Sequence, residues 1–248
     1  MTSTSETGHA KIVAHFEKLL AVVTAFGADY SPSRSSIQLA ALNAQLTAAT
    51  AAIANINELE ATHKHALAAR DAAFKPISKL ITRVSSALKA SGTTPQDIEA
   101  ALTLVRKLQG RRASRKLTDE EIKELEAQGE TVSQASSSQM SFDKRLDNFD
   151  KFIQLLNSDA AYCPNEEALK TTSLRALFTQ LKAVNLAVIN AQISLDEART
   201  TRDNLLYQPG SGVVDTSTDV KNYVKSVYGP SSRQYKSLSS LKFTAPKL

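Results

Sequence analysis

The stretch "LAALNAQLTAATAAIANINELEATHKHALAARDAAFKP", from Leu39 to Pro76, decides the fold class of this protein. A series of mostly apolar positions recurs at alternating intervals of three and four residues, which places them on one face of an α-helix. The pattern runs through five turns or more, so it predicts one long helix that packs along a partner as in a coiled coil. The positions are Leu39, Leu42, Leu46, Ala49, Ile53, Ile56, Glu60, His63, Leu67, Arg70 and Phe74.

A second stretch further along the chain has the same spacing. Its positions are Leu174, Leu177, Leu181, Val184, Val188, Ala191, Leu195, Ala198, Arg202 and Leu205. Each stretch is followed by a proline, Pro76 or Pro209, which ends or bends a helix because it lacks the backbone N–H. The sequence therefore predicts two long helices of the same design.

The similarity extends beyond the long helices and predicts an internal duplication. Tyr30 and Pro32 recur as Tyr162 and Pro164, and other matches keep the same order along the chain. They include Phe16 with Phe149, Leu39 with Leu174, Arg70-Asp71 with Arg202-Asp203, and Leu88–Gly92 with Val224–Gly229. We expect one helical repeat over residues 1–109 and another over 142–248. A charged and Ser/Gln-rich connector spans 110–141.

Composition agrees with a helical chain of long elements. Aromatic residues make up 6% of the sequence, and Gly and Pro number only 8 and 7, so turns are few. We expect an all-α, elongated, antiparallel bundle made of two tandem halves. The halves either pack side by side or stand as separate lobes. We also expect the second long helix to begin near Asn165, and a short helix over Asp119–Gln128, with Thr118 and Glu121 as a capping box.

The most specific candidate site is the repeated pair Arg70-Asp71 and Arg202-Asp203. An arginine at a core-facing heptad position is costly unless it is paired. One interpretation is an anion or partner site at a pseudo-two-fold axis. The favoured interpretation is an arginine that fixes helix register by pairing with a carboxylate across the bundle.

Glu60 and His63 lie three residues apart, the spacing by which helical bundles hold two metal ions. The equivalent positions of the second long helix hold Leu195 and Ala198 instead. We therefore interpret Glu60 and His63 as a polar register pair and expect no metal and no cofactor. The sequence has no Gly-rich phosphate loop and no Cys-x-x-Cys, and we expect no enzymatic activity.

A basic cluster begins the connector and could contact nucleic acid or anionic lipid. The acidic run "DEEIKELEAQGE" follows it at once and can neutralise it, so we consider nucleic-acid binding the weaker interpretation. The basic residues are Arg106, Lys107, Arg111, Arg112, Arg115 and Lys116.

The segments "SFDKRLDNFDKFIQLL", "YCPNE" and "VKSVYGPSSRQYKSLSSLKF", within residues 141–243, resemble a group of uncharacterised bacterial helical proteins. The resemblance implies a helical fold and brings no activity, cofactor or site residue with it.

Three functions of different classes fit these features. The first is a non-enzymatic structural, scaffold or self-assembling protein, whose partner is a second copy or another protein. The second is a membrane-active, pore-forming protein with "LLAVVTAF" (Leu19–Phe26) as the inserting segment, although no apolar run approaches 18 residues. The third is a binder of nucleic acid or anionic surfaces through residues 106–116. The polar N-terminus lacks the apolar region of a secretion signal, so we expect a cytoplasmic protein.

Overall fold

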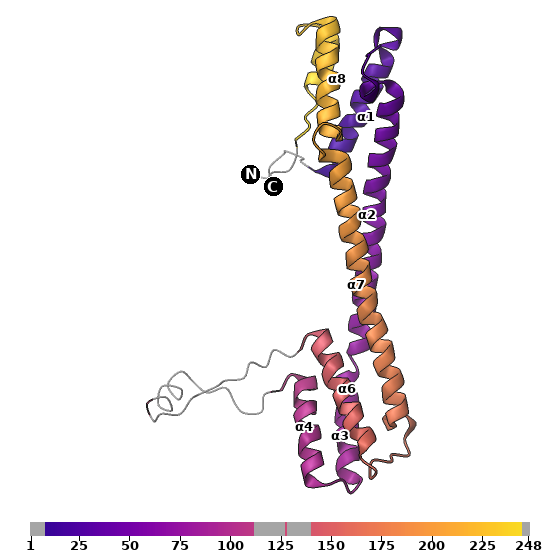
Figure 1. Ribbon diagram of the computed structural model, residues 1–248, viewed down its shortest axis with the longest axis vertical. Helices are drawn as coiled ribbons and strands as arrows, with labels where there is room; N and C mark the ends of the chain where they lie inside the picture. Colours follow the sequence, from indigo (N-terminus) through magenta and orange to yellow (C-terminus); the bar gives the residue numbers. More distant parts are fainter. Residues whose placement is uncertain (1–7, 112–126, 128–139, 245–248) are drawn as a thin grey trace. The chain divides into compact units, whose positions relative to one another are not determined.

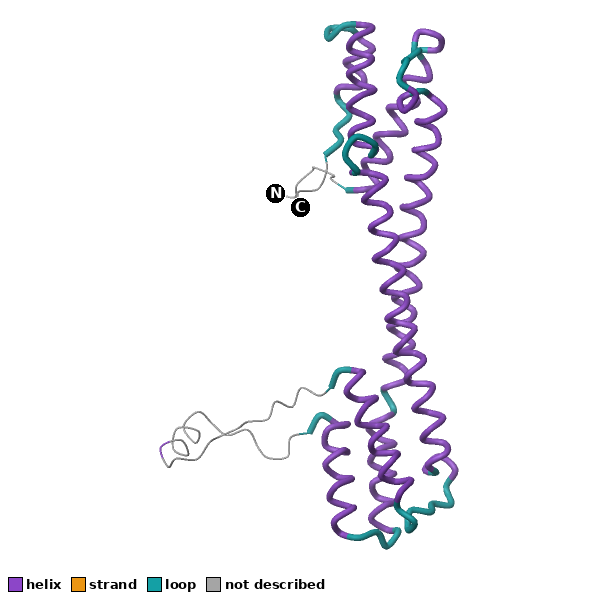
Figure 2. The backbone as a smooth tube through the Cα atoms, in the orientation of Figure 1, coloured by secondary structure: helices purple, strands orange, loops and turns teal. Residues whose placement is uncertain are grey.

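A computed structural model describes residues 8–111, 127 and 140–244, and the regular structure among them is entirely helical (Figures 1 and 2). This confirms the predicted all-α class. The predicted connector helix at Asp119–Gln128 and its capping box fall almost entirely outside the described residues.

The helices follow one another in an order that repeats. A medium-length helix is followed by short 3₁₀ turns, a long helix and then two shorter helices. The first series is α1 (His9–Ala25), 3₁₀ turns at Gly27–Asp29 and Ser35–Ile37, α2 (Leu39–Phe74), α3 (Ile77–Ala90) and α4 (Pro95–Gln109). The second series is α6 (Phe142–Ser158), a 3₁₀ turn at Glu167–Leu169, α7 (Thr171–Tyr207), α8 (Val213–Tyr228) and α9 (Arg233–Ser239).

The chain folds into two compact units, and neither follows the range of one predicted repeat. Unit 1 consists of Met1–His63 and Ala191–Leu248, and unit 2 consists of Lys64–Asn190. Unit 1 therefore contains α1, α8, α9 and one part each of α2 and α7. Unit 2 contains α3, α4, α6 and the remaining parts of the two long helices. Each unit thus combines elements from both predicted repeats.

The core of unit 1 forms where α1 and α8 pack against the adjoining parts of the long helices. Phe16 and Leu19 of α1 are fully buried there, as are Val220 and Val224 of α8. The stretch "LLAVVTAF" contributes Leu19, Leu20 and Val23 to this core. Its apolar residues therefore stabilise the unit by about 1.5–3 kcal/mol for each large side chain removed from water.

The core of unit 2, like that of unit 1, consists mainly of phenylalanine rings and aliphatic side chains. Phe149 and Phe152 of α6 pack with Ile81 and Leu88 of α3. In both long helices the heptad positions face inward: Leu42, Ala49, Ile56 and Phe74 are buried in α2, and Leu174, Leu181, Val188 and Leu195 in α7. The 3,4 spacing therefore identified the packed face correctly.

The predicted start of the second long helix near Asn165 is wrong. Residues Glu167–Leu169 form a 3₁₀ turn, Lys170 is extended with ψ 144°, and α7 begins at Thr171. The cause is tertiary, because Leu169 is buried and its carbonyl accepts a hydrogen bond from the Tyr162 hydroxyl at 2.8 Å. That contact holds the chain in a turn where local capping signals favour a helix.

Candidate functional site

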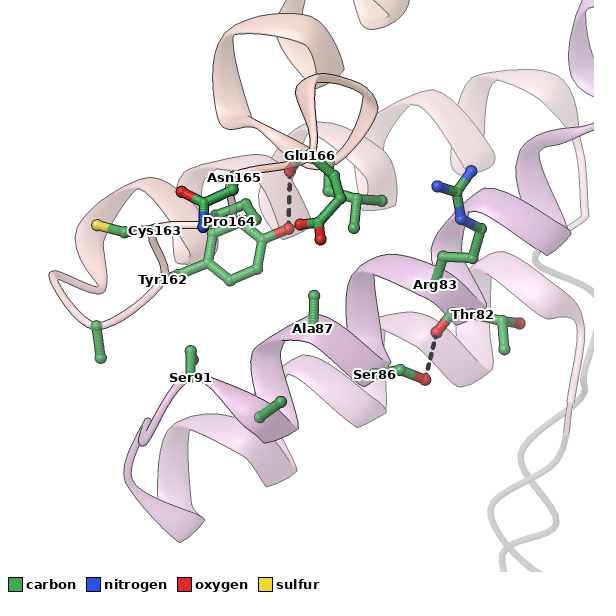
Figure 3. Close-up of a pocket in the computed structure, with 13 residues that line it drawn as sticks. Thr82, Arg83, Ser86, Ala87, Ser91, Tyr162, Cys163, Pro164, Asn165 and Glu166 are labelled. Carbon is green, nitrogen blue, oxygen red and sulfur yellow. Dashed lines mark hydrogen bonds between the residues drawn. The ribbon is translucent and has the colours of Figure 1, made fainter.

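A groove in unit 2 carries both charged and aromatic groups. It lies between α3 and the turn Asp159–Leu169, and its volume is about 750 Å³. One wall is the α3 face with Arg83 and Ala87, and the other is the turn with Tyr162 and Glu166 (Figure 3).

Tyr162 fixes the aromatic wall of the groove. Its side chain is 5% exposed, and its hydroxyl donates to the Leu169 carbonyl at 2.8 Å. Burial raises the pKa of Tyr162 to about 12, and the nearby Glu166 carboxylate adds to the shift. The Tyr162 hydroxyl is therefore neutral across the physiological pH range, and very little of the ring is exposed to the groove.

Asp159 ties the turn to the end of α3. Its carboxylate accepts hydrogen bonds from the Thr93 hydroxyl at 2.5 Å and from the Ala161 backbone N–H at 2.9 Å. The Thr93 hydroxyl in turn lies 2.7 Å from the Ser91 hydroxyl. These bonds connect the turn to the segment that directly follows α3. Cys163 is exposed at the rim of the groove.

Unit 1 has the same arrangement of turn and helix, formed by residues 27–38 and α8. Tyr30 donates to the Ile37 carbonyl at 2.6 Å, and burial raises its pKa to about 12 as well. There the space beside the tyrosine is occupied. Tyr223 of α8 packs edge-on against Tyr30 with ring centroids 5.3 Å apart, and its hydroxyl accepts the Ser31 N–H at 3.1 Å.

An ion pair accompanies Tyr223 in unit 1. The Arg34 guanidinium donates to Asp219 of α8 at 2.6 Å. In unit 2 the charges are exchanged, since Glu166 lies on the turn and Arg83 on the helix. Among the described residues neither Glu166 nor Arg83 forms an ion pair, so both charges remain available at the groove.

Arg70 and Asp71 belong to unit 2, where Arg70 lies on an aromatic ring. Its Cζ is 3.8 Å from the centroid of Phe142, and Nη1 lies 3.4 Å from the Asn185 side-chain oxygen. Asn185 in turn donates to Asp143 at 2.8 Å. Arg70 therefore makes a cation–π contact with Phe142 and a hydrogen bond to Asn185 in place of the predicted pairing with a carboxylate across the bundle. This arrangement avoids placing a second charge beside the arginine.

Arg202 and Asp203 belong to unit 1, and there the two residues pair with each other. Arg202 donates from Nε at 2.9 Å and from Nη2 at 2.8 Å to the Asp203 carboxylate. His9 lies nearby, with Nδ1 2.8 Å from the Tyr207 hydroxyl. Burial lowers the pKa of His9, and the positive charge of Arg202 lowers it further. The two Arg-Asp pairs therefore lie in different units and have different partners.

The register pair of Glu60 and His63 stays a prediction, and the contact observed for Glu60 is with the other long helix. Its carboxylate accepts from Arg199 of α7 at 3.3 Å, and Arg199 also bonds Asp196. The residues that the structure describes contain no group of three His, Cys, Asp or Glu side chains placed to hold a metal ion.

The basic cluster is described in part. Arg106 donates to the Thr103 hydroxyl at 2.8 Å on α4, and Arg111 is exposed just after Gly110 ends that helix. Arg112, Arg115 and Lys116 lie outside the described residues.

The outward face of α7 carries a second apolar series that sequence inspection missed. Leu186, Ile189 and Ile193 are 52%, 44% and 51% exposed and are spaced three and four residues apart. We call these three residues the α7 stripe. Lys182 precedes the stripe by one turn, and Asp196 and Glu197 follow it. The outward positions of α2 that correspond to the stripe hold Ala51, Ala54 and Glu58.

Comparison with protein-family models, with curated proteins and with solved structures found no significant match.

Proposed function

We propose that this protein is a non-enzymatic structural protein that self-associates through the α7 stripe. The observation that carries the proposal is the exposure of Leu186, Ile189 and Ile193 on one helical face. Exposed apolar residues in a contiguous row are typical of interaction surfaces, whereas single ones need no explanation. Their 3,4 spacing matches a coiled-coil seam, so a helix of the same kind is a complementary partner.

A second copy of the chain in antiparallel orientation fits the charges around the stripe. Lys182 lies at one end, and Asp196 and Glu197 at the other. Antiparallel pairing about Ile189 brings the basic end of each α7 beside the acidic end of its partner. Parallel pairing instead places like charges together, which is destabilising.

The size of the stripe predicts weak association. Burying the exposed part of each of its side chains contributes about 1 kcal/mol, so the two copies together gain roughly 6 kcal/mol. Loss of translational and rotational freedom costs an estimated 4–15 kcal/mol. Because the gain exceeds only the lowest estimate of this cost, we expect a weak dimer that also needs the charge pairs at the ends of the stripe and that forms only towards the upper end of a concentration range of about 10 μM to 1 mM.

Sedimentation velocity of the full chain over that concentration range tests the proposal. The natural sequence is expected to shift from monomer to dimer, and Ile189→Glu to remain monomeric. Two matched controls are Val227→Glu, at an apolar residue of α8 that is 48% exposed, and Ala54→Glu, at the corresponding outward position of α2. Both controls should dimerise as the natural sequence does. A monomer at every concentration contradicts the proposal.

A charge exchange tests the orientation. Lys182→Glu should weaken the dimer, because it sets three acidic side chains beside one another. Adding Glu197→Lys to Lys182→Glu should restore it. Failure of the second change to restore association eliminates the antiparallel arrangement while leaving the stripe itself intact.

The proposal includes the internal duplication predicted from the sequence. Its support is the pair of matching contacts in the two units, in which Tyr30 and Tyr162 each donate to the carbonyl seven residues later. Elements of the two repeats then combine within each unit, as they do when two copies of an ancestral chain exchange their C-terminal helices before fusion.

The membrane-active alternative draws on one observation about α2. The run Leu39–Ala90 contains an 18-residue window of mean hydropathy 1.3, of which 22% is buried. By length and composition this window could cross a bilayer. A search for uninterrupted apolar runs misses it because Asn43, Gln45 and Asn55 interrupt the sequence. Dye release from liposomes tests this alternative, and intact vesicles at high protein concentration would exclude it.

A further inference from the structure

The outward face of α3 carries a row of basic side chains. Lys75, directly before the helix, and Lys79 and Arg83 within it recur every four residues, and all three are exposed. Pro76 has helical backbone angles, with φ −76° and ψ −13°, so the row continues across it. Neighbouring members of the row lie about 6 Å apart along the helix axis. We call these three residues the α3 basic row.

The charges of the α3 basic row have no partner within the described part of the chain. None of the three side chains forms an ion pair or a hydrogen bond with another described residue. Acidic side chains of unit 2 are engaged elsewhere, Asp147 with Lys151, Asp150 with Arg175 and Glu167 with Lys170. Like charges one helical turn apart repel each other, so the row does not stabilise α3. Asp71, one turn before Lys75, ends it.

Unit 1 has the opposite charge at the corresponding positions. The buried residues Ile77, Ile81, Val84 and Leu88 of α3 match Val213, Ser217, Val220 and Val224 of α8 at a constant offset. With this offset Lys79 corresponds to Asp215 and Arg83 to Asp219. Asp215 accepts a backbone N–H at 2.7 Å, and Asp219 pairs with Arg34. A helix in this position therefore does not need basic charges in order to pack.

The end of α4 adds to the basic surface. Gln109 donates to the Ser78 carbonyl at 3.2 Å and to the Thr82 hydroxyl at 2.9 Å, so the last turn of α4 lies beside α3 (Figure 1). Arg106 belongs to that turn, and the exposed Arg111 follows it. Among the described residues of unit 2, Lys and Arg outnumber Asp and Glu, whereas in unit 1 they are nearly balanced. The structure thus joins the α3 basic row to the start of the basic cluster.

We propose that the α3 basic row binds the phosphate backbone of a nucleic-acid duplex. Each strand presents a regular series of phosphates, which Lys and Arg contact without reading the bases. α3 contains no aromatic residue on which an unpaired base would stack, which favours a duplex over a single strand. None of the exposed large apolar residues in the described part of the chain lies on α3, so the row has no apolar neighbour on that helix to enter a bilayer.

Fluorescence anisotropy of a short labelled DNA duplex, titrated with the full chain, provides the test. Each phosphate contacted adds about 0.9 to the slope of log K against log salt. Three contacts predict a slope of about −2.7 or steeper, which is roughly 40-fold weaker binding at 200 mM salt than at 50 mM. Two duplexes of unrelated sequence should bind equally. Absence of binding at the lower salt concentration, or binding that salt does not weaken, would overturn the proposal.

Substitutions at two positions of the row locate the surface. Lys79→Asp with Arg83→Asp gives α3 the residues of α8 and should abolish binding, while the thermal unfolding midpoint is retained. Lys79→Gln with Arg83→Gln should lower the slope by about 1.8. The matched control is Lys18→Gln with Lys236→Gln, which removes two exposed charges of unit 1 and should bind as the natural sequence does. Unchanged affinity of the Lys79→Gln, Arg83→Gln variant would show that the row is not the surface.

Other polyanions provide the remaining arms of the test. Vesicles of phosphatidylserine and phosphatidylcholine should bind the chain more weakly than the duplex does, and polyglutamate should not displace the duplex at equal charge concentration. Tighter binding to the vesicles would reassign the row to a membrane surface, and displacement would reassign it to an acidic protein. Ile189→Glu should bind the duplex as the natural sequence does, so failure of self-association and failure of duplex binding are distinguishable.

Discussion

The two compact units have the same arrangement of a turn beside a helix, but they differ in the side chains that the helix places next to the turn. In each, a buried tyrosine of a turn donates to a carbonyl seven residues later, Tyr30 to Ile37 and Tyr162 to Leu169. In unit 1 the adjoining helix covers that tyrosine with Tyr223 and an ion pair. In unit 2 the adjoining helix leaves it beside a groove. Corresponding helix positions thus hold a tyrosine that packs on the turn in one unit and an alanine beside a groove in the other.

The largest effect should come from the two matching core phenylalanines, and it tests whether the units are equivalent in stability. Phe16→Ala and Phe149→Ala each remove a fully buried ring. Each should lower the free energy of unfolding by about 3–5 kcal/mol, measured by urea denaturation. Losses that differ by more than about 2 kcal/mol would show that the two cores do not contribute equally.

A smaller loss should follow removal of either turn hydroxyl. Tyr30→Phe and Tyr162→Phe leave the Ile37 or Leu169 carbonyl without its donor. Each change should cost about 1–3 kcal/mol of unfolding free energy, again by urea denaturation. The matched control is Tyr223→Phe, whose hydroxyl accepts a bond at an exposed backbone N–H and should cost less. If Tyr162→Phe lowers the free energy of unfolding no more than Tyr223→Phe does, the hydroxyl of Tyr162 does not stabilise its turn as proposed.

The same tyrosines predict how stability depends on alkaline pH. Burial raises the pKa of both Tyr30 and Tyr162 from 10.0 to about 12, so the folded state keeps protons that the unfolded state releases. The free energy of unfolding should therefore be fully retained below pH 10 and should fall as pH rises towards 12. Equilibrium unfolding across this range should show a flatter profile for the double variant Tyr30→Phe/Tyr162→Phe. An unchanged slope would contradict the assignment.

The smallest effect concerns the charges. Arg34→Ala removes an ion pair whose side chains are 54% and 33% exposed, so it should cost about 0.2–1 kcal/mol. Arg83→Ala removes a charge that pairs with no described residue and should leave the unfolding free energy unchanged. Urea denaturation at low salt checks both. A measurable loss for Arg83→Ala would mean that it pairs in solution with Glu166 as Arg34 does with Asp219.

Much of the helical pattern could be predicted from residue spacing, because burial of one face is periodic in the sequence. The 3,4 series placed α2 at its observed bounds, and Thr94 caps α4 as its position before Pro95 suggests. The start of α7 could not be predicted in this way, because the Tyr162–Leu169 contact overrides the local helix signal at Asn165.

The groove of unit 2 could not be predicted from the sequence for a different reason. Arg83 and Ala87 lie one turn apart on α3, but Glu166 is far from them in the chain and the three form no motif. A signal was nevertheless present, because the matching segments of the sequence carry exchanged charges at aligned positions and alanine in one where the other has tyrosine. Finding it requires knowing which helix packs on which turn.

The sequence by itself determined the helical class, the inward faces of the long helices and the order of elements, because these depend on local propensity and on periodicity. The tertiary structure alone decided that each unit takes helices from both predicted repeats, since contacts between distant segments are not periodic. It also decided that Arg70 lies on Phe142 while Arg202 pairs with Asp203. A partly buried arginine takes whichever partner the surrounding helices bring to it.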